Sequence, residues 1–274
     1  MDKPTLGLAL SGGTAKSVAH IGVLEALEEA GIRPDYLAGT SGGAIVGAIY
    51  AAGVPISRLK EIAINLRWKH LARITFPKLG LLSNSGVQRL ITDLLGDVTF
   101  AELQIPLSIV ATDLLRGTKV VLKEGRVAPA VMMSSSIPNV FEPIPHDDTL
   151  IVDGGLVEYL PVETVLEYRP DLVVGVNLGY RETRSTLPRH LLHVAMAVTG
   201  VAAQHNARLS ETKADIVIRP STARFPSFDL MASSELIGVG YSAAKDRIPD
   251  VLAALDRVQA GPGWMERLKF WNRA

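Results

Sequence analysis

The segment that decides the fold places a serine between glycines, after a short apolar run and before a helix-forming run: Tyr36-Leu37-Ala38-Gly39-Thr40-Ser41-Gly42-Gly43-Ala44-Ile45-Val46. A strand that turns abruptly into a helix at Ser41 would expose its hydroxyl at the end of a sheet, and Gly39 and Gly43 would leave room for neighbouring backbone. The pattern predicts a nucleophile elbow for acyl transfer. An ordinary strand-to-helix turn with Ser41 as the helix cap is the alternative.

Apolar strand-like runs alternate with helical runs along the whole chain. We expect strands at residues 6–10, 36–38, 105–111, 118–122, 149–152, 172–177 and 215–219, and helices at 18–30, 44–52, 190–210 and 234–258. This alternation predicts an α/β protein with a mostly parallel sheet between helices. Repeats, low-complexity tracts and linkers are lacking, so we expect one domain over residues 4–258 and a tail over 259–274.

Composition narrows the class of protein further. The 274 residues include 28 Lys and Arg against 28 Asp and Glu, so no field of one sign favours nucleic acid. There is no cysteine, which excludes disulfides, thiolate metal sites and a cysteine nucleophile. Together with the lack of a signal-peptide core, this fits a cytoplasmic protein. The uncharged residues 36–57 contain five glycines and a proline, which favours a buried strand and helix over a membrane span.

A second informative segment directly follows the first expected strand: Gly12-Gly13-Thr14-Ala15-Lys16-Ser17. Backbone N–H groups in such a turn converge and bind negative charge, either a phosphate or the oxyanion of a tetrahedral intermediate. A P-loop would need glycines where Leu10 and Ala15 stand, and a dinucleotide fingerprint would need them at Thr14 and Ser17. The oxyanion hole is therefore favoured, while a nucleotide-binding protein that uses the Gly12–Ser17 loop stays an alternative.

The third segment is Asp153-Gly154-Gly155, at the end of an expected strand. An Asp-Gly turn is the ordinary interpretation. A serine nucleophile, however, needs a base, and none of the six histidines lies on a loop after a late strand, where a Ser-His-Asp hydrolase carries its histidine. His190, His193 and His205 fall in an expected helix, and His20 lies in the first one. The sequence therefore favours a Ser-Asp pair.

The three segments together resemble the patatin-like phospholipase family, from about residue 6 to residue 258. The resemblance implies a three-layer α/β/α sandwich and hydrolysis of lipid acyl esters, of the phospholipase A, lysophospholipase or esterase type. It implies that Ser41 is the nucleophile and Asp153 the base, and that the oxyanion hole comprises Gly12, Gly13, Thr14 and Lys16. A lipid or acyl-ester substrate is expected, with no metal and no cofactor.

The chain departs from the family pattern at three positions of the Gly-rich loop. Thr14 stands where a third glycine is usual, Ser17 where glycine recurs, and Lys16 where arginine is commonest. A β-branched residue restricts the backbone of the loop, and lysine lacks the planar fork of arginine. A catalytically inactive patatin-like binding protein is thus a further alternative, although both Ser41 and Asp153 are retained.

The tail, residues 259–274, has one candidate apolar face. Trp264, Leu268 and Trp271 recur at helical spacing, with Arg267 and Arg273 nearby. One interpretation is an interfacial helix that gives the protein a peripheral contact with a membrane; the other is a terminal helix docked on the domain. Nothing in the sequence fixes the oligomeric state.

Overall fold

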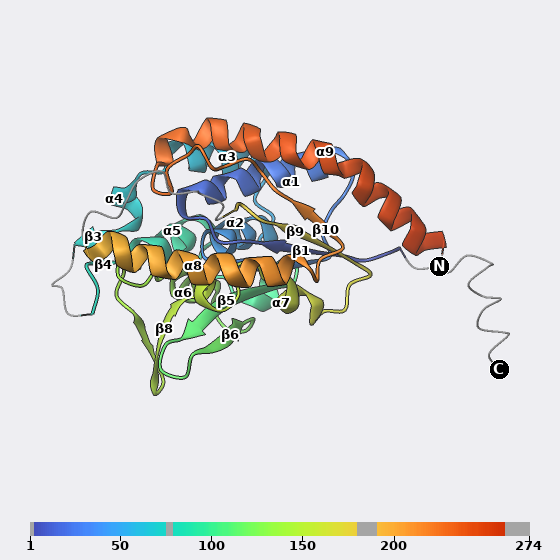
Figure 1. Cartoon of the computed structure of the whole chain (residues 1–274). Coiled ribbons are helices and arrows are strands. Elements are labelled where there is room, and N and C mark those ends of the chain that lie inside the picture. The colour runs from blue at the N-terminus through green and yellow to red at the C-terminus, as the bar shows by residue number, and fades with distance from the viewer. Residues whose placement is uncertain (1–2, 75–78, 180–190, 261–274) are drawn as a thin grey trace, which may run out of the picture.

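The computed structural model describes residues 3–74, 79–179 and 191–260 of the chain. Strands and helices alternate through these ranges (Figure 1). The strands are β1 (Leu6–Leu10), β2 (Tyr36–Thr40), β3 (Arg73–Ile74), β4 (Leu82–Ser83), β5 (Leu107–Asp113), β6 (Thr118–Leu122), β7 (Ile144–His146), β8 (Thr149–Asp153), β9 (Leu172–Val176) and β10 (Ile216–Ile218).

Helices occupy most of the intervening chain, and four of them are single 3₁₀ turns. The α-helices are α1 (Ala19–Glu29), α2 (Gly42–Ala51), α3 (Ile56–Asn65), α4 (Trp68–Leu71), α5 (Ser85–Leu95), α6 (Val127–Ser134), α7 (Val162–Leu166), α8 (Leu191–Glu211) and α9 (Ser233–Ala260). The 3₁₀ turns are η1 (Thr14–Val18), η2 (Phe100–Glu102), η3 (Gly154–Leu156) and η4 (Leu230–Ala232).

One large mixed sheet runs through the middle of the molecule in the order β10-β9-β1-β2-β5-β8-β7, with β6 also paired to β5. The strands from β10 to β5 are parallel to one another. The pairs made by β6, β7 and β8 are antiparallel. The expected parallel sheet is confirmed, with an antiparallel extension at the β5 side that sequence alternation did not predict.

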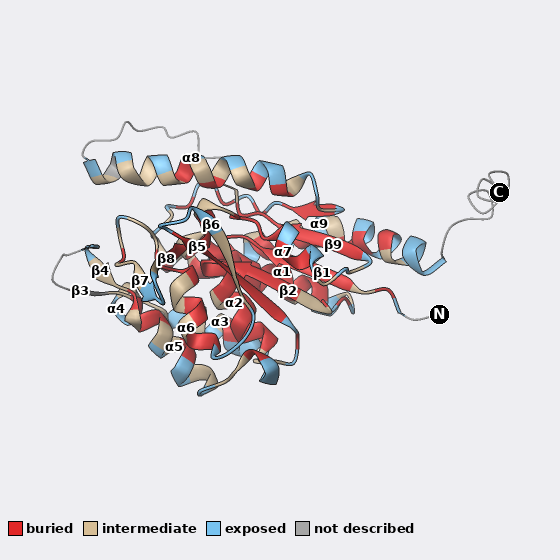
Figure 2. Cartoon of the chain, turned by 90° about the horizontal axis from the view of Figure 1, so that it is seen from below, coloured by how far each residue is buried: buried red, intermediate tan, exposed pale blue. Residues whose placement is uncertain are grey.

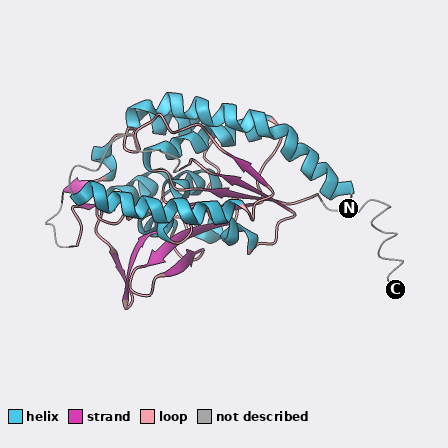
Figure 3. Cartoon of the chain, in the orientation of Figure 1, coloured by secondary structure: helices cyan, strands magenta, loops and turns pink. Residues whose placement is uncertain are grey.

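Helices cover both faces of this sheet, which gives three layers (Figure 3). Along β1, Leu8 and Leu10 pack into a core shared with α1, α2 and α9, whereas Ala9 packs on the other face with residues of α7 and α8. Figure 2 shows α8 and α2 on opposite sides of the buried strands. Because neighbouring residues of a strand point to opposite faces, a continuous apolar run can be buried on both. The predicted α/β/α sandwich is therefore confirmed.

Several local expectations are met within one or two residues, and others need correction. Residues 36–57 form β2, α2 and the start of α3, and no helix in the described ranges is long and apolar enough to cross a bilayer. The first helix begins later than expected, because residues 14–18 form the 3₁₀ turn η1. The sequence analysis did not identify α3, α5, α6 or α7. Of the tail, residues 259 and 260 close α9 and the rest lies outside the described residues.

Candidate active site

The two key segments meet because the strands that carry them end at adjacent residues of β5. Thr40, the last residue of β2, pairs with Val110 in parallel. Asp153, the last residue of β8, pairs with Ala111 in antiparallel fashion. The two strands thus run toward each other along one edge of β5, and both stop there. Ser41, one residue beyond β2, is brought to the end of β8.

Ser41 forms a strained turn between β2 and α2. Its φ is 54° and its ψ is −122°, a conformation that non-glycine residues rarely adopt. The backbone crowds closely around it: a Cβ at Gly39 would lie 2.7 Å from the Cα of Ala44, and one at Gly43 would lie 2.3 Å from the carbonyl oxygen of Leu10. Both glycines are therefore required by the turn, as expected for a nucleophile elbow.

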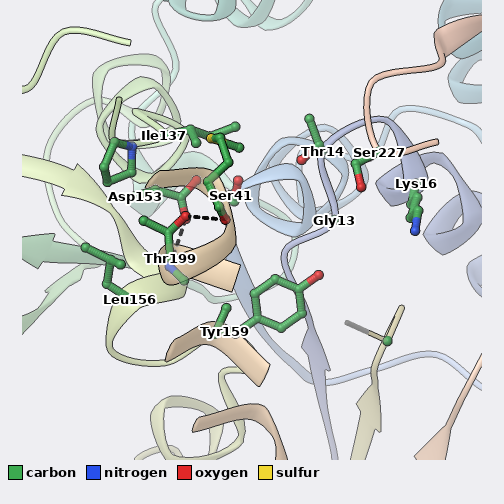
Figure 4. Close-up of a pocket in the computed structure, with 15 residues that line it drawn as sticks. Gly13, Thr14, Lys16, Ser41, Ile137, Asp153, Leu156, Tyr159, Thr199 and Ser227 are labelled. Atoms are coloured by element: carbon green, nitrogen blue, oxygen red, sulfur yellow. Dashed lines mark hydrogen bonds between the residues drawn. The ribbon is translucent and has the colours of Figure 1, made fainter. Parts of the chain in front are cut away.

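The side chains of Ser41 and Asp153 are in direct contact. The Ser41 side chain donates a hydrogen bond to the Asp153 carboxylate (Figure 4). The N–H of Gly155 donates to Oδ1 of the same carboxylate at 2.8 Å. Burial raises the pKa of Asp153 to about 6, although the two hydrogen bonds act to lower it. At neutral pH the group is an ionised carboxylate in contact with a serine hydroxyl, and its pKa suits a proton acceptor.

Gly154 allows the Asp153 turn to lie close against β5. A Cβ at this position would lie 2.2 Å from the carbonyl oxygen of Val110. At Gly155 the nearest atom to a Cβ is Oδ1 of Asp153 itself, at 3.0 Å. A side chain at either glycine would displace the carboxylate from Ser41. The two glycines therefore hold the Asp153 carboxylate next to Ser41, in addition to forming a turn.

The Gly-rich loop leaves two backbone N–H groups without an acceptor among the described residues. The N–H of Gly12 donates to the carbonyl of Tyr159, that of Ala15 to the carbonyl of Ser227, and that of Lys16 to the carbonyl of Gly13, each at 3.0 Å. The N–H groups of Gly13 and Thr14 make no such bond within those residues. Both residues line the cavity that also contains Ser41 and Asp153.

The departures from the family pattern in this loop have visible consequences. Thr14 adopts a φ of 52°, in the left-handed region that favours the glycine usual at this position. Ser17 places a buried hydroxyl against Gly42, and this hydroxyl has no hydrogen-bond partner among the described residues. Lys16 is buried and borders the cavity, but its ammonium group points away from Ser41 (Figure 4). The loop thus brings Gly13 and Thr14 to the site and directs the charge of Lys16 elsewhere.

Three residues that the sequence analysis missed support the site. Ser134 accepts the N–H of Ser41 at 2.8 Å and donates to the carbonyl of Val110 at 2.6 Å, so it ties the elbow to β5. Asn206 of α8 donates to the carbonyls of Gly155 and Leu156. Its side-chain oxygen accepts the N–H of Tyr159. A single serine or asparagine within a helix belongs to no recognisable sequence motif, so the sequence alone could not indicate these two roles.

Tyr159 is the third of these supporting residues. Its carbonyl holds Gly12, and its ring lies against the same glycine, where a Cβ would approach ring carbon Cε2 to 2.8 Å. The tyrosine also lines the cavity. It therefore joins the Gly-rich loop to the segment that follows Asp153, and Gly12 has a packing role next to it.

Among the described residues, histidines and potential metal ligands do not gather at this site. His20 is fully buried in α1, where Nε2 lies 2.9 Å from the carbonyl oxygen of Ser11 and burial lowers the pKa to about 4. His205 lies in α8, and His190 lies outside the described residues. Within the described ranges, no three histidine, aspartate or glutamate side chains are placed to hold a metal ion together.

Fold and site define a three-layer α/β/α protein with an elbow serine bonded to a buried carboxylate. The family model for "Patatin-like phospholipase" matches residues 8–166, more than half of the chain. The chain belongs to this family, as the sequence resemblance predicted.

Curated relatives and a solved structure agree with the assignment. An uncharacterized NTE family protein of Mycobacterium tuberculosis (strain H37Rv) is 36% identical over 185 residues, which cover 65% of this chain and 50% of the relative. Patatin-like phospholipase domain-containing protein 6 of Mus musculus is 31% identical over 188 residues, 65% of this chain and 14% of that protein. The chain spans about half the length of the mycobacterial relative and much less of the mouse one. VipD from Legionella pneumophila has the same fold, with a TM-score of 0.54 at 14% identity over 91% of this chain and 67% of VipD.

Proposed function

We propose that this protein is a lipid acyl hydrolase in which Ser41 attacks the ester and Asp153 accepts its proton. The observation that carries the proposal is the hydrogen bond from the strained Ser41 to the buried Asp153 in the wall of a cavity. A serine hydroxyl is a weak nucleophile without a base, and here the carboxylate is the only titratable side chain bonded to it among the described residues.

The reaction follows from these two groups. Ser41 Oγ adds to the acyl carbon while its proton passes to Asp153. The tetrahedral intermediate then expels the alcohol, which takes that proton and leaves an acyl-serine ester. Water attacks this ester, gives one proton to Asp153 and releases the carboxylic acid as Ser41 recovers its proton. Asp153 thus alternates between base and acid, and its pKa of about 6 suits both roles.

The N–H groups of Gly13 and Thr14 are the proposed donors to the oxyanion. They line the cavity beside Ser41 and have no acceptor within the described residues. Preorganised donors of this kind contribute about 10²–10³ in rate each. Gly12, which bonds to Tyr159, supports the loop. Lys16 would act through the field of its charge, because its ammonium group does not reach toward Ser41.

Family membership supports a lipid ester as the substrate, of the phospholipase A, lysophospholipase or esterase type. The two alternatives have weaker support. A nucleotide cradle would need more unoccupied N–H groups than Gly13 and Thr14 supply. An inactive binding protein would have no use for a strained Ser41 and a buried carboxylate, both of which oppose stability.

The test is covalent labelling with a fluorophosphonate together with hydrolysis of lipid and soluble esters. Wild-type protein should label and hydrolyse, Ser41→Ala should do neither, and Asp153→Asn should lose nearly all turnover. Because Asp153 must be ionised to act, the rate should rise with pH through about 6 and then level off.

The controls separate the competing functions. Asp153→Asn must melt as wild type does, or higher, because an uncharged amide replaces a buried carboxylate. Hydrolysis that survives Ser41→Ala would refute the proposal. If His20→Ala folds normally but loses a comparable share of the hydrolysis rate, a histidine takes part in the mechanism. If the protein binds ATP at micromolar concentration and Gly13→Pro abolishes that binding, the nucleotide alternative is favoured.

A further inference from the structure

Two cavities of different character meet at Ser41. The first is lined by Asp153, Lys16, Tyr159 and Thr199, among others (Figure 4). The second shares only Thr14, Ser41 and Ile137 with the first in their described linings. Its other lining residues come from α2 and α3, from η1, and from α1, α4, α5 and neighbouring segments. A substrate with its ester at Ser41 can therefore extend into both.

The second cavity, which we call the apolar cavity, has no charged side chain in its described lining. Two of its polar groups are already bonded: the Ser135 hydroxyl to the carbonyl of Val131, and the Trp68 indole N–H to the carbonyl of Phe228. Ser17 adds one buried hydroxyl that finds no hydrogen-bond partner in the part of the chain that the structure describes. Such a wall offers little to a headgroup, whereas the burial of each methylene of a hydrocarbon chain against it is favourable.

The apolar cavity begins at the reacting serine and follows α2. Gly42, the first residue of the helix, lines it, and so do Ile45, Val46 and Ile49 farther along. Seven residues of α-helix rise about 10 Å, the length of an extended chain of about eight carbons. The cavity therefore has the direction and the length of a single hydrocarbon chain that starts at Ser41.

Its far end is closed by buried side chains. Ile49 of α2 and Leu59 of α3 are 3% and 2% exposed, and Ala63 of α3 is 5% exposed. All three line the cavity. Tightly packed helices do not separate easily to admit a longer chain, because interiors are close-packed. Ile49 and Leu59 are thus in position to limit how far a chain can enter.

We propose that the apolar cavity holds the acyl chain of the ester, and that Ile49 and Leu59 restrict it to about eight to ten carbons, the reach of two turns of α2. The alcohol that leaves occupies the first cavity, between Asp153 and the Gly-rich loop. This inference rests on the proposed function. It adds that the length of the acyl chain determines which substrates are accepted. It favours medium-chain acyl esters over the long chains of bulk membrane lipid.

The test is a series of esters that share one leaving group and differ only in acyl length, from about two to about sixteen carbons. Up to about eight to ten carbons, kcat/KM should rise by up to about fourfold per methylene, the equivalent of 0.8 kcal/mol. Beyond that length it should fall. Leu59→Ala should move the optimum to longer chains, and Ile49→Phe should move it to shorter ones.

Matched variants separate specificity from stability. Leu27→Ala removes a side chain that is 1% exposed in α1 and outside the cavity lining, so it should lower the melting temperature and leave the chain-length optimum in place. Leu59→Val provides a milder change if Leu59→Ala does not fold. An optimum that moves with neither position, or a flat profile, would overturn the inference. Absence of Ser41-dependent hydrolysis for every ester would instead refute the proposed function.

Discussion

The two helix layers that enclose the sheet are held by different means. On one side, α1 and α9 touch backbone to backbone: a Cβ at Gly22 would lie 1.9 Å from the carbonyl oxygen of Ile237, and one at Gly240 would lie 1.9 Å from that of Ala19. On the other side, α8 packs through small residues such as Ala203 and Ala207. Several of its larger apolar residues are exposed instead: Leu191, Val194, Val198, Val201 and Leu209.

Because of this difference, the α1–α9 contact and α8 contribute differently to stability and to the geometry of the site. Within the described residues, neither α1 nor α9 contributes a side chain that bonds to Ser41 or Asp153, and their close contact leaves no room for a larger side chain. The α8 layer borders the first cavity through Met196, Thr199 and Ala203 and holds the Asp153 segment through Asn206. We infer that the α1–α9 contact mainly determines whether the chain folds, and that α8 determines how the Asp153 side of the site is arranged once it has folded.

The largest effect is expected at the α1–α9 contact. Gly240→Ala places a methyl group against the Ala19 carbonyl, so the helices must separate, and the free energy of unfolding should fall by about 3 kcal/mol or more. Gly238→Ala is the matched control in the same helix, because no atom lies within 4 Å of a Cβ there. It should stabilise the protein by about 0.5–1 kcal/mol through helix propensity. Urea unfolding of both variants measures the difference, and equal stabilities would contradict the proposed close contact.

An intermediate effect is expected where α8 holds the site. Asn206→Ala removes three hydrogen bonds and should lower the free energy of unfolding by about 2 kcal/mol. Fluorophosphonate labelling of Ser41 should slow more than the melting temperature suggests, because the loop after Asp153 loses its anchor. The control is Gln204→Ala, two residues away in α8, which should change neither. Loss of stability with a normal labelling rate would show that Asn206 serves folding alone.

The smallest effect is expected on the outer face of α8. Val201 is 67% exposed, so Val201→Gln should change the free energy of unfolding by less than about 0.5 kcal/mol. Ala207 is 3% exposed on the inner face, and Ala207→Gln should destabilise clearly because it forces a long polar side chain into packed space. Thermal melts of the pair measure how sharply the two faces differ. A large loss at Val201 would mean that this face is covered in the intact protein.

The sequence predicted the strands of the central sheet except β7, and the two residues that the sheet brings together, because both follow local patterns. Ser41 and Asp153 each follow an apolar run and precede glycines, and the family resemblance linked them. The supports of the site could not be predicted in this way. Asn206 looks like any polar residue of a helix, and Ser134 like any small one, because their roles depend on contacts between segments distant in the chain. The reversed direction of β8 was hidden for the same reason.

The meeting of β2 and β8 on one edge of β5 also sets the order of events during synthesis. Ser41 emerges early and Asp153 much later, so the unfinished chain contains Ser41 without the carboxylate to which it later bonds. Closing that long loop must wait until β5 provides the edge on which both strands end, and contacts so distant in sequence form slowly. Under the proposed function, reactivity toward esters would therefore appear only once the chain has been made beyond Asp153 and has folded onto β5, and a shorter growing polypeptide would stay inert.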